Sequence, residues 1–403
     1  MTLTLAAGVA ACGSGSQDSP SGRPAEGAVT PLTAAEGSPS TASWTPWPQA
    51  LHDAQHSGAA SVAGPTTDHV RWSRELEGNV TPGPVIAKDG TIYAASNAGV
   101  LHAIDPRNGK DRWVVDGGGS YGIDQSTSPA VLPDGLVLWP GPGGQLIAVA
   151  PAGVVAWRLD LGGQVTSPAV LADGSTTVGT SNGLLVGLRP DASGPRESWR
   201  VDLDEQSYGS PVFSPDGQRV YQSVVSGVVA VDEGTVVWHS PPLKMVEVSP
   251  AVAPDGTIVI GTNDAYEYGL SPGDGTVTWR HRRGFITYSS PVVTRDGIAY
   301  FGDHGNRITG VDATTGTEVF GFQGSRKDVN PGGIGIWTSV LVDADHSVYA
   351  GTRQGLIYGV DRTGRRMWQI EAGSTVDSYP ALTADGALII GTSDGRLLAI
   401  ADS

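Results

Sequence analysis

Short apolar runs alternate with turn sequences along most of this chain, and one phrase recurs. The phrase is a Ser-Pro pair, a short apolar run, an Asp-Gly pair and a second apolar run, as in SPAVLPDGLVLWP from Ser128 and SPAVAPDGTIVIGT from Ser249. An Asp-Gly pair between apolar runs is typical of a β-hairpin, because the turn needs the positive φ that glycine adopts without strain. A third apolar run, such as LHAID from Leu101, and a fourth that carries an aromatic residue complete the unit. The pattern therefore predicts four short strands per repeat.

The repeat occurs eight times, with a period of 39 to 48 residues. Its anchor positions are Pro84, Pro129, Pro168, Pro211, Pro250, Pro291, Ser339 and Pro380. Units of four antiparallel strands with this period are typical of β-propellers. We therefore predict an all-β fold over residues 70–403, an eight-bladed β-propeller of four-stranded antiparallel blades.

The aromatic residues of the fourth strands are out of step with the anchors. Trp72 stands before the first anchor, whereas the last unit, GTSDGRLLAIADS from Gly391, ends without an aromatic strand. A ring left open at this point would expose unpaired strand edges. We predict that an N-terminal strand around Trp72, in VRWSREL, pairs with RLLAIAD in the last C-terminal blade and closes the ring.

The composition fits this architecture and excludes one class of partner. The chain has 57 glycines and 28 prolines in 403 residues, and only 16% of its residues are charged. This mixture is typical of many short strands and tight turns. The formal net charge is −16, and no cluster of Lys and Arg is present. We therefore expect no binding to nucleic acid, whose phosphates require such a cluster.

The first residues carry a different signal. Residues 3–11 are apolar and lead through Val-Ala-Ala into Cys12, which is the only cysteine. This stretch resembles the lipobox of bacterial lipoproteins, in which cleavage makes the cysteine a lipid-bearing N-terminus. The resemblance implies a signal peptide over residues 1–12 and an extracytoplasmic protein, periplasmic or at the cell surface, that meets the membrane only through a lipid on Cys12. A lone cysteine also excludes an intramolecular disulfide and a Cys-based zinc site.

Two segments separate Cys12 from the repeats. Residues 13–43 are rich in Ser, Gly and Pro without periodicity, and we expect a disordered tether there. Residues 44–69 form a leader that contains HDAQH, His52–His56. Its two histidines match the His-Glu-x-x-His zinc pattern only superficially, because Asp replaces the glutamate and no third ligand is evident. We therefore expect no metal site.

The repeats also carry a family resemblance. Ala103, Gly109 and Trp113 have the Ala-x5-Gly-x3-Trp spacing of the tryptophan-docking motif in pyrroloquinoline-quinone-type (PQQ-type) β-propellers. The resemblance covers about residues 44 to 403 and implies that each docking aromatic packs between neighbouring blades. The implied docking residues are Trp72, Trp113, Trp157, Trp199, Trp238, Trp279, Phe320 and Trp368.

Some PQQ-type propellers are quinoprotein dehydrogenases. Such enzymes use a pair of adjacent cysteines, a tryptophan floor, a calcium ion held by carboxylate and amide oxygens, and a catalytic aspartate. This chain has no cysteine after Cys12, and the large insertions that build such a site are absent. We therefore favour a protein without catalytic residues and without a cofactor, and PQQ with calcium is the alternative.

Residues just before the innermost strands of a propeller surround the mouth of its central channel. At these positions the chain carries carboxylates and aromatic residues that differ between blades, whereas residues used only for packing should be more uniform. Carboxylates beside aromatic rings suit a peptide, a sugar or a cation, and a solvated loop rim is the alternative. The candidate binding residues are Tyr121, Asp124, Glu205, Tyr208, Glu247, Tyr288, Trp337 and Asp377.

Two functions compete on these grounds. The first is a non-catalytic, monomeric scaffold that binds an envelope protein or polymer, similar in build to the lipoprotein scaffold subunit of the outer-membrane barrel-assembly machinery. The second is an enzyme or sensor that binds a small ligand in the channel, such as a quinoprotein-type dehydrogenase. The missing cysteines and insertions favour the first.

Overall fold

The computed structural model describes residues 46–121, 127–191, 194–325 and 335–403. The chain divides into a unit that ends at Ala35 and a unit from Glu36 to Ser403, and the described residues all belong to the second. Cys12 and the tether lie outside them. None of the described residues forms a helix long and apolar enough to cross a membrane.

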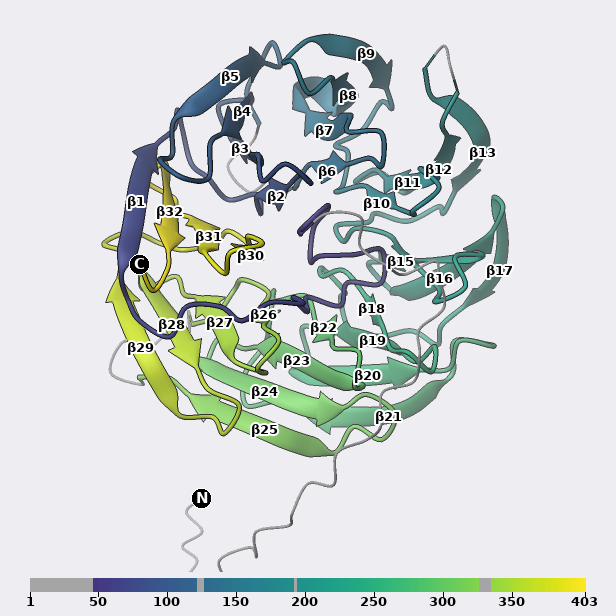
Figure 1. The fold of residues 1–403 in the computed structure, drawn as a ribbon. Coiled ribbons are helices and arrows are strands. Elements are labelled where there is room, and N and C mark those ends of the chain that lie inside the picture. Colours follow the sequence, from purple (N-terminus) through teal and green to yellow (C-terminus); the bar gives the residue numbers. More distant parts are fainter. Residues whose placement is uncertain (1–45, 122–126, 192–193, 326–334) are drawn as a thin grey trace, which may run out of the picture. The chain divides into compact units, whose positions relative to one another are not determined.

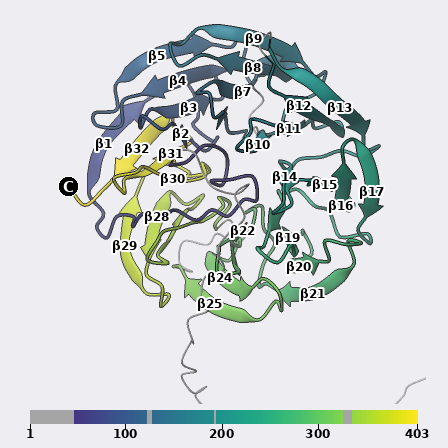
Figure 2. The same ribbon diagram turned by 45° about the vertical axis from the view of Figure 1, so that its right-hand side comes forward.

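Eight four-stranded antiparallel sheets form a closed ring around a common centre (Figures 1 and 2). Figure 1 shows the shortest strand of each sheet at the centre and the aromatic strand at the periphery. This arrangement confirms the predicted all-β, eight-bladed propeller. We number the blades in the chain order of their innermost strands.

The strands follow the predicted order in every blade. Blades 1 to 4 consist of β2 (Val85–Ile86), β3 (Ile92–Ser96), β4 (Val100–Ile104), β5 (Asp111–Asp116); β6 (Ala130–Val131), β7 (Val137–Gly141), β8 (Gln145–Val149), β9 (Val155–Asp160); β10 (Ala169–Val170), β11 (Thr176–Gly179), β12 (Leu184–Arg189), β13 (Arg196–Asp202); β14 (Val212–Phe213), β15 (Arg219–Val224), β16 (Gly227–Asp232) and β17 (Thr235–His239). A short 3₁₀ turn, η2 (Pro142–Gly144), joins β7 to β8.

The remaining four blades repeat the pattern. They consist of β18 (Ala251–Val252), β19 (Ile258–Gly261), β20 (Tyr266–Leu270), β21 (Val277–Arg282); β22 (Val292–Val293), β23 (Ile298–Gly302), β24 (Arg307–Asp312), β25 (Glu318–Gln323); β26 (Leu341–Val342), β27 (Val348–Gly351), β28 (Leu356–Val360), β29 (Arg366–Glu371); β30 (Ala381–Leu382), β31 (Leu388–Gly391), β32 (Arg396–Ile400) and β1 (Val70–Glu75).

Strands from the two ends of the described chain pair and close the ring, as predicted. Strand β1 pairs antiparallel with β32, and Trp72 lies opposite Ala399. The order β1-β32-β31-β30 makes blade 8 from both ends of the chain. Closure leaves no blade with three strands, and each outermost strand has a partner on its inner side.

The anchor serines link neighbouring innermost strands. The amide of Ser128 donates to Oγ of Ser167 at 2.8 Å, and the amide of Ser249 donates to Oγ of Ser290 at 3.0 Å. The amide of Gly83 reaches Oγ of Ser128 in the same way, at 2.9 Å. A short side chain with a hydroxyl therefore satisfies a buried backbone donor of the preceding blade, which explains why the repeated phrase begins with serine.

The docking aromatics lie on the outermost strands and face the next blade. The indole N–H of Trp72 donates to the carbonyl of Pro106, and that of Trp279 donates to the carbonyl of Ala313, both at 2.8 Å. A Cβ atom on Gly109 would lie 2.8 Å from the ring of Trp72, so only glycine leaves room for the indole. The spacing of glycine and tryptophan in the motif thus reflects contacts between different blades.

The leader supplies this contact where the chain is interrupted. Blade 8 has no continuous turn between its third and fourth strands, because β32 and β1 come from opposite ends of the chain. The indole N–H of Trp368 in blade 7 donates instead to the carbonyl of Pro65, at 2.8 Å. Asp402 accepts from the amides of Thr66 and Thr67, which fastens the leader to the C-terminal end.

The rest of the leader runs around the centre of the ring from blade 1 to blade 7, inside the innermost strands (Figure 1). Carbonyl oxygens of Trp47, Pro48, Ala54, Gln55, His56 and Gly58, and the side chain of Gln49, each accept one backbone hydrogen bond from an innermost strand. The donors are the amides of Ile86, Val131, Val170, Phe213, Val252, Val293 and Val342, at 2.6–3.2 Å. Because each innermost strand is the edge of its sheet, these amides would otherwise be unpaired in the interior.

The HDAQH stretch belongs to this irregular backbone. His52 and His56 have positive φ values of 83° and 58°, so they are not one helical turn apart. Nδ1 of His56 lies 2.9 Å from the carbonyl of Pro250, and burial lowers the pKa of His56 to about 4. Asp53 accepts from the amide and hydroxyl of Ser57. These side chains hold the leader in place.

Replacing Gln49 by alanine should lower the free energy of unfolding by about 1–3 kcal/mol, since two buried backbone groups lose their partner. In the side chain of Gln49, Oε1 accepts a hydrogen bond from the amide of Val170 at 2.7 Å, and Nε2 donates to the carbonyl of Val170 at 3.0 Å. Urea unfolding would measure the loss. Gln145→Ala is the matched control, because Gln145 is half-exposed, and it should change stability by less than about 0.5 kcal/mol. Equal losses in both variants would contradict a fastening role for the leader.

Candidate functional site

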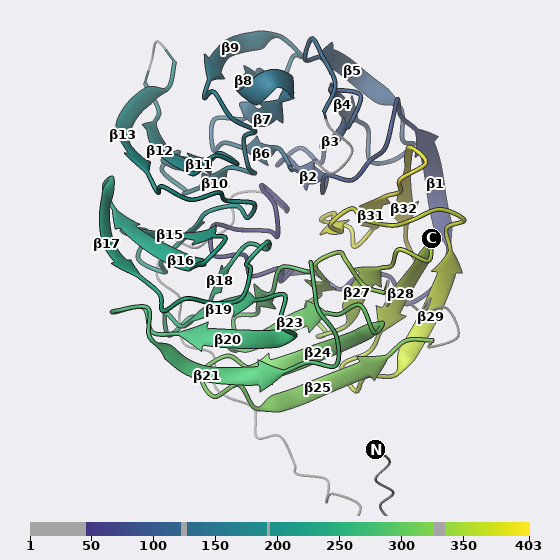
Figure 3. The same cartoon turned by 180° about the vertical axis from the view of Figure 1, so that it is seen from behind.

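The antiparallel strands give the ring two different sides, which Figures 1 and 3 view in turn. One side of the ring carries the loops that join each outermost strand to the next blade. It also carries the turns between second and third strands, and we call this side the loop face. We call turn face the side with the Asp-Gly turns between first and second strands and the turns between third and fourth strands. The candidate residues that the structure describes lie in the loops of the loop face.

Tyr121 differs from the other candidates. It is half-buried against the core of blades 1 and 2, and its hydroxyl donates to the carbonyl of Pro140. Burial raises the pKa of the Tyr121 hydroxyl. This side chain therefore packs within the fold and offers little to a ligand. Asp124, its neighbour among the candidates, lies outside the described residues.

Glu205 and Tyr208 lie on the loop between blades 3 and 4. Glu205 accepts hydrogen bonds from the hydroxyl and amide of Ser226, at 2.8 and 3.1 Å. Tyr208 is 51% exposed, and its hydroxyl donates to Oε1 of Gln206 at 3.2 Å. The carboxylate of Glu205 is thus held by Ser226 of blade 4, whereas the phenol of Tyr208 projects to solvent.

The structure brings three candidates together with two further residues in what we call the mouth cluster, formed by Tyr288, His304, Trp337, Arg353 and Asp377. The ring centroid of Trp337 lies 5.2 Å from that of His304 in a parallel stack and 4.5 Å from that of Tyr288. Cζ of Arg353 lies 3.2 Å from the Trp337 centroid, and its Nε donates to Asp377 at 3.3 Å. The cluster spans blades 6 to 8.

Electrostatics keep the cluster close to neutral. Burial, followed by the charges of Arg353 and Arg283, lowers the pKa of His304 to about 4, so the imidazole is uncharged at neutral pH. Burial, followed by the charge of Glu247, raises the pKa of Tyr288. Glu247 itself accepts a hydrogen bond from the side-chain Nδ2 of Asn263. Arg353 and Asp377 then neutralise one another.

The sequence analysis missed His304 and Arg353. Both lie in turns between second and third strands, in DHGN (Asp303–Asn306) and TRQG (Thr352–Gly355). In an antiparallel blade these turns share a face with the loops before the innermost strands. The predicted topology therefore implies that side chains in these turns lie beside those in the loops.

Large apolar side chains are exposed on neighbouring loops of the same face. We call them the rim patch, and they lie on the loops that lead into blades 4, 5 and 6. The rim patch consists of Tyr208, Met245, Phe285 and Ile286, with exposed fractions of 51%, 51%, 46% and 37%. An exposed apolar group with polar neighbours is typical of an interaction site.

The described residues do not fit PQQ with calcium. Among them, no three His, Cys, Asp or Glu side chains are placed to hold a metal ion. The indole of Trp337 is already in contact with the guanidinium of Arg353, which occupies a face on which a quinone would stack. The adjacent cysteines of quinoprotein dehydrogenases have no counterpart in the sequence. We therefore derive no redox step for this site.

Similar structures show the same fold. A crystal structure of BamB from Moraxella catarrhalis matches with a TM-score of 0.63 and 16% identity, covering 82% of this chain and 99% of that one. A quinohemoprotein alcohol dehydrogenase from Comamonas testosteroni matches with a TM-score of 0.66 and 15% identity, covering 89% of this chain and 80% of that one. At such low identities the likeness shows the propeller fold alone.

Comparison with related sequences identifies the family of this chain. Protein Rv3035 of Mycobacterium tuberculosis is 26% identical, over 88% of this chain and 95% of its own length. The outer membrane protein assembly factor BamB of Moranella endobia is 25% identical, over 77% of this chain and 82% of its own length. The family model for outer membrane protein assembly factor BamB matches residues 56–124 and 188–403, more than half of the chain. The resemblance to PQQ-like propellers is thereby confirmed, and the chain belongs to the BamB family.

Proposed function

We propose that this protein is a non-catalytic scaffold of the cell envelope, held on a membrane by a lipid on Cys12, that binds a partner protein on its loop face. The observation that carries the proposal is the rim patch. Aromatic residues and methionine are enriched in the centres of protein interfaces, and this patch offers both on consecutive loops. Burial of Phe285 or Met245 by a partner would remove apolar surface from water.

The mouth residues would form the polar margin of this interface. Glu205 and Glu247 lie in the same loops as Tyr208 and Met245, and both already accept hydrogen bonds from their own blades. Carboxylates held in this way keep their geometry when a partner arrives, so little side-chain entropy is lost on binding. Polar margins of this kind select a partner more than they add affinity.

The relatives suggest the biological setting. Several of them are named outer membrane protein assembly factor BamB, from Moranella endobia to Salmonella typhimurium. We propose that the partner is an envelope protein engaged in such assembly, and that the propeller binds it as a monomer. The lipid on Cys12 would keep the propeller at the membrane surface where such a partner is assembled, which raises its effective concentration there.

Photocrosslinking in the native envelope tests the proposal. A photoreactive amino acid at Tyr208 should give a crosslink to a distinct protein. The double variant Met245→Asp/Phe285→Asp should reduce that crosslink about tenfold or more, since a charge replaces each apolar contact. In the same cells, Cys12→Ser should release the propeller from the membrane fraction.

The matched control is Val319→Asp on the outermost strand of blade 6. Val319 is 55% exposed, so the change adds a charge to an exposed apolar position away from the rim patch. It should leave the crosslink unchanged. An equal loss in the control, or a crosslink that survives the double variant, would overturn the proposed interface.

A further inference from the structure

The turn between third and fourth strands is longest in blade 3. The paired residues Gly187 and Trp199, which bracket it, are twelve positions apart, whereas Ala103 and Trp113 in blade 1 are ten apart. In this family of repeats the turn normally carries a glycine against the docking indole of the preceding blade. The length of the turn therefore affects the contact between blades 2 and 3.

The docking contact at this junction is loose. A Cβ atom on Gly153 would lie 2.7 Å from the ring of Trp113, and one on Gly316 would lie 2.6 Å from that of Trp279. In blade 3 the position four residues before the outer aromatic is Pro195 instead of glycine, and a Cβ atom on the preceding Gly194 would be 3.8 Å from Trp157 with no other atom within 4 Å. Gly194 thus stands away from the indole of Trp157, which is half-buried.

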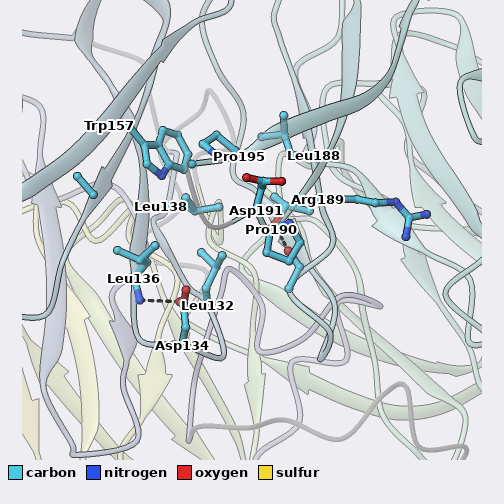
Figure 4. Close-up of a pocket in the computed structure, with 14 residues that line it drawn as sticks. Leu132, Asp134, Leu136, Leu138, Trp157, Leu188, Arg189, Pro190, Asp191 and Pro195 are labelled. Atoms are coloured by element: carbon cyan, nitrogen blue, oxygen red, sulfur yellow. Dashed lines mark hydrogen bonds between the residues drawn. The ribbon is translucent and has the colours of Figure 1, made fainter.

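A groove of about 410 Å³, lined largely by apolar side chains, lies at this junction on the turn face (Figure 4). Its walls include Trp157 and Pro195 on one side and Leu188 and Pro190 on the other, above a floor that includes Leu136 and Leu138. Figure 4 shows the side chain of Arg189 extending away from the remaining labelled residues. The groove is therefore lined by hydrocarbon, with carboxylates of Asp134 and Asp191 at its margin.

A second groove, of about 490 Å³, lies on the other side of blade 3. It shares Thr176, Leu188 and Arg189 with the first groove, and it contains the docking residue Trp199 beside Phe213. The two grooves thus flank blade 3 and meet across it. Together they offer a mainly apolar recess beside Trp157 and a more polar recess beside Trp199.

The margins of the two grooves are acidic. Their lining contains five carboxylates, from Asp134, Asp173, Asp191, Asp216 and Glu233, against a single guanidinium, from Arg189. Arg189 lines both grooves, and its guanidinium lies 3.8 Å from the carboxylate of Glu233. Hydrogen bonding from Ser214 lowers the pKa of Asp216, so this carboxylate is ionised at neutral pH. The grooves therefore repel phosphate groups and attract cations.

We propose that these two grooves bind an extended, basic and apolar peptide segment of a partner protein. Its leucine, valine or proline side chains would enter the recesses beside Trp157 and Trp199, in the manner by which aromatic grooves bind extended Pro-rich segments. Its lysine or arginine side chains would face the carboxylates at the margins. This surface is separate from the rim patch, which lies on the opposite face, so the protein would join two partners.

Fluorescence anisotropy with the full-length protein tests the site. The probe is a labelled synthetic peptide in which leucine and proline alternate with lysine, and the comparison peptide carries glutamate in place of lysine. The lysine peptide should bind at least about tenfold more tightly, and raising the salt concentration should weaken it because the attraction is between exposed charges. Leu136→Asn should weaken binding about tenfold, and Asp134→Asn/Asp173→Asn about threefold or more.

Matched controls come from the same turn in other blades. Asp255 and Asp296 occupy the Asp-Gly turns of blades 5 and 6, and Asp255→Asn/Asp296→Asn should leave peptide binding unchanged. The rim-patch variant Met245→Asp/Phe285→Asp should also bind normally, which separates a failure here from a failure of the loop-face function. Equal affinity for both peptides, or normal binding by the Leu136 variant, would overturn the proposal. So would a self-association, seen by sedimentation, that the groove variants abolish.

Discussion

Replacing Arg283 by methionine is expected to lower the free energy of unfolding by about 3–5 kcal/mol above pH 8, because it leaves a buried carboxylate without its partner charge. Nε of Arg283 lies 3.2 Å from Oε2 of Glu267, and the two side chains are 1% and 0% exposed. Arg283 also donates to the carbonyls of Thr262 and Tyr266, both at 2.8 Å. The variant loses all three interactions.

The loss should grow with pH. Burial raises the pKa of Glu267 from 4.5 to about 7, although the charge of Arg283 opposes this rise. A neutral Glu267 therefore stabilises the wild-type protein fully below about pH 4.5, and this stability is lost as the pH rises through about 7. Without Arg283 the pKa should rise further, so the variant continues to lose stability above pH 7, where the wild-type contribution no longer changes. Urea unfolding at pH 5 and pH 9 measures the difference.

The double variant Arg283→Met/Glu267→Gln is the control. It replaces the pair by two uncharged groups of similar volume, a change that is often neutral for a buried ion pair. We expect it to recover at pH 9 the part of the loss that is due to the charge of Glu267, without the hydrogen bonds to Thr262 and Tyr266, and to show no pH-dependent contribution from this site between pH 5 and pH 9. If Arg283→Met loses the same free energy at both pH values, the loss reflects the hydrogen bonds to Thr262 and Tyr266 and the contact with Phe301, and the electrostatic account is wrong.

The propeller could be predicted because its signals are local. Each Asp-Gly pair fixes a hairpin, and a period near 40 residues in the sequence implies the ring. The closing pair of Trp72 with the last strand also followed from counting, since one strand was surplus at the start and one was missing at the end. These inferences needed no knowledge of side-chain contacts.

The role of the leader could not be predicted in the same way. Its residues form hydrogen bonds with the innermost strands of seven different blades, and His52 and Leu51 adopt positive φ in an irregular path. No periodic pattern marks such a segment, because its partners are distant backbone groups. The sequence therefore indicated only that residues 44–69 precede the repeats.

Only part of the candidate site could be predicted, because the repeat pattern gives the position of a loop residue but not the direction of its side chain. The position before each innermost strand led to Tyr288 and Asp377, which lie in the mouth cluster. The same rule gave the neighbourhood of Tyr121, where the side chain instead packs against the core and reaches Pro140. Whether a loop side chain points inward depends on cavities between blades, which a repeat alignment does not show. The loose contact at Trp157 likewise depends on the turn of the following blade.

Replacing Trp279 by alanine is expected to lower the free energy of unfolding by about 3–5 kcal/mol, the usual loss for a large buried aromatic side chain. Trp279 is 8% exposed, and its ring lies against Gly316 of the next blade. Its N–H donates to the carbonyl of Ala313 at 2.8 Å, and that acceptor would lose its partner. The change thus opens a cavity at the junction of blades 5 and 6. Calorimetric or urea unfolding would measure it.

Trp157→Ala is the matched comparison, because the same residue type at the same strand position there lines an open groove. We expect it to cost about 1–2 kcal/mol, since the indole is half-buried and its removal enlarges a recess that already admits water. The difference between the two losses in free energy of unfolding would measure how much weaker the contact between blades 2 and 3 is than the contact between blades 5 and 6. Equal losses would mean that Trp157 docks as tightly as Trp279, and the groove would then close in solution. A smaller loss at Trp157 would support a junction that is kept open at the expense of stability, as a binding surface requires.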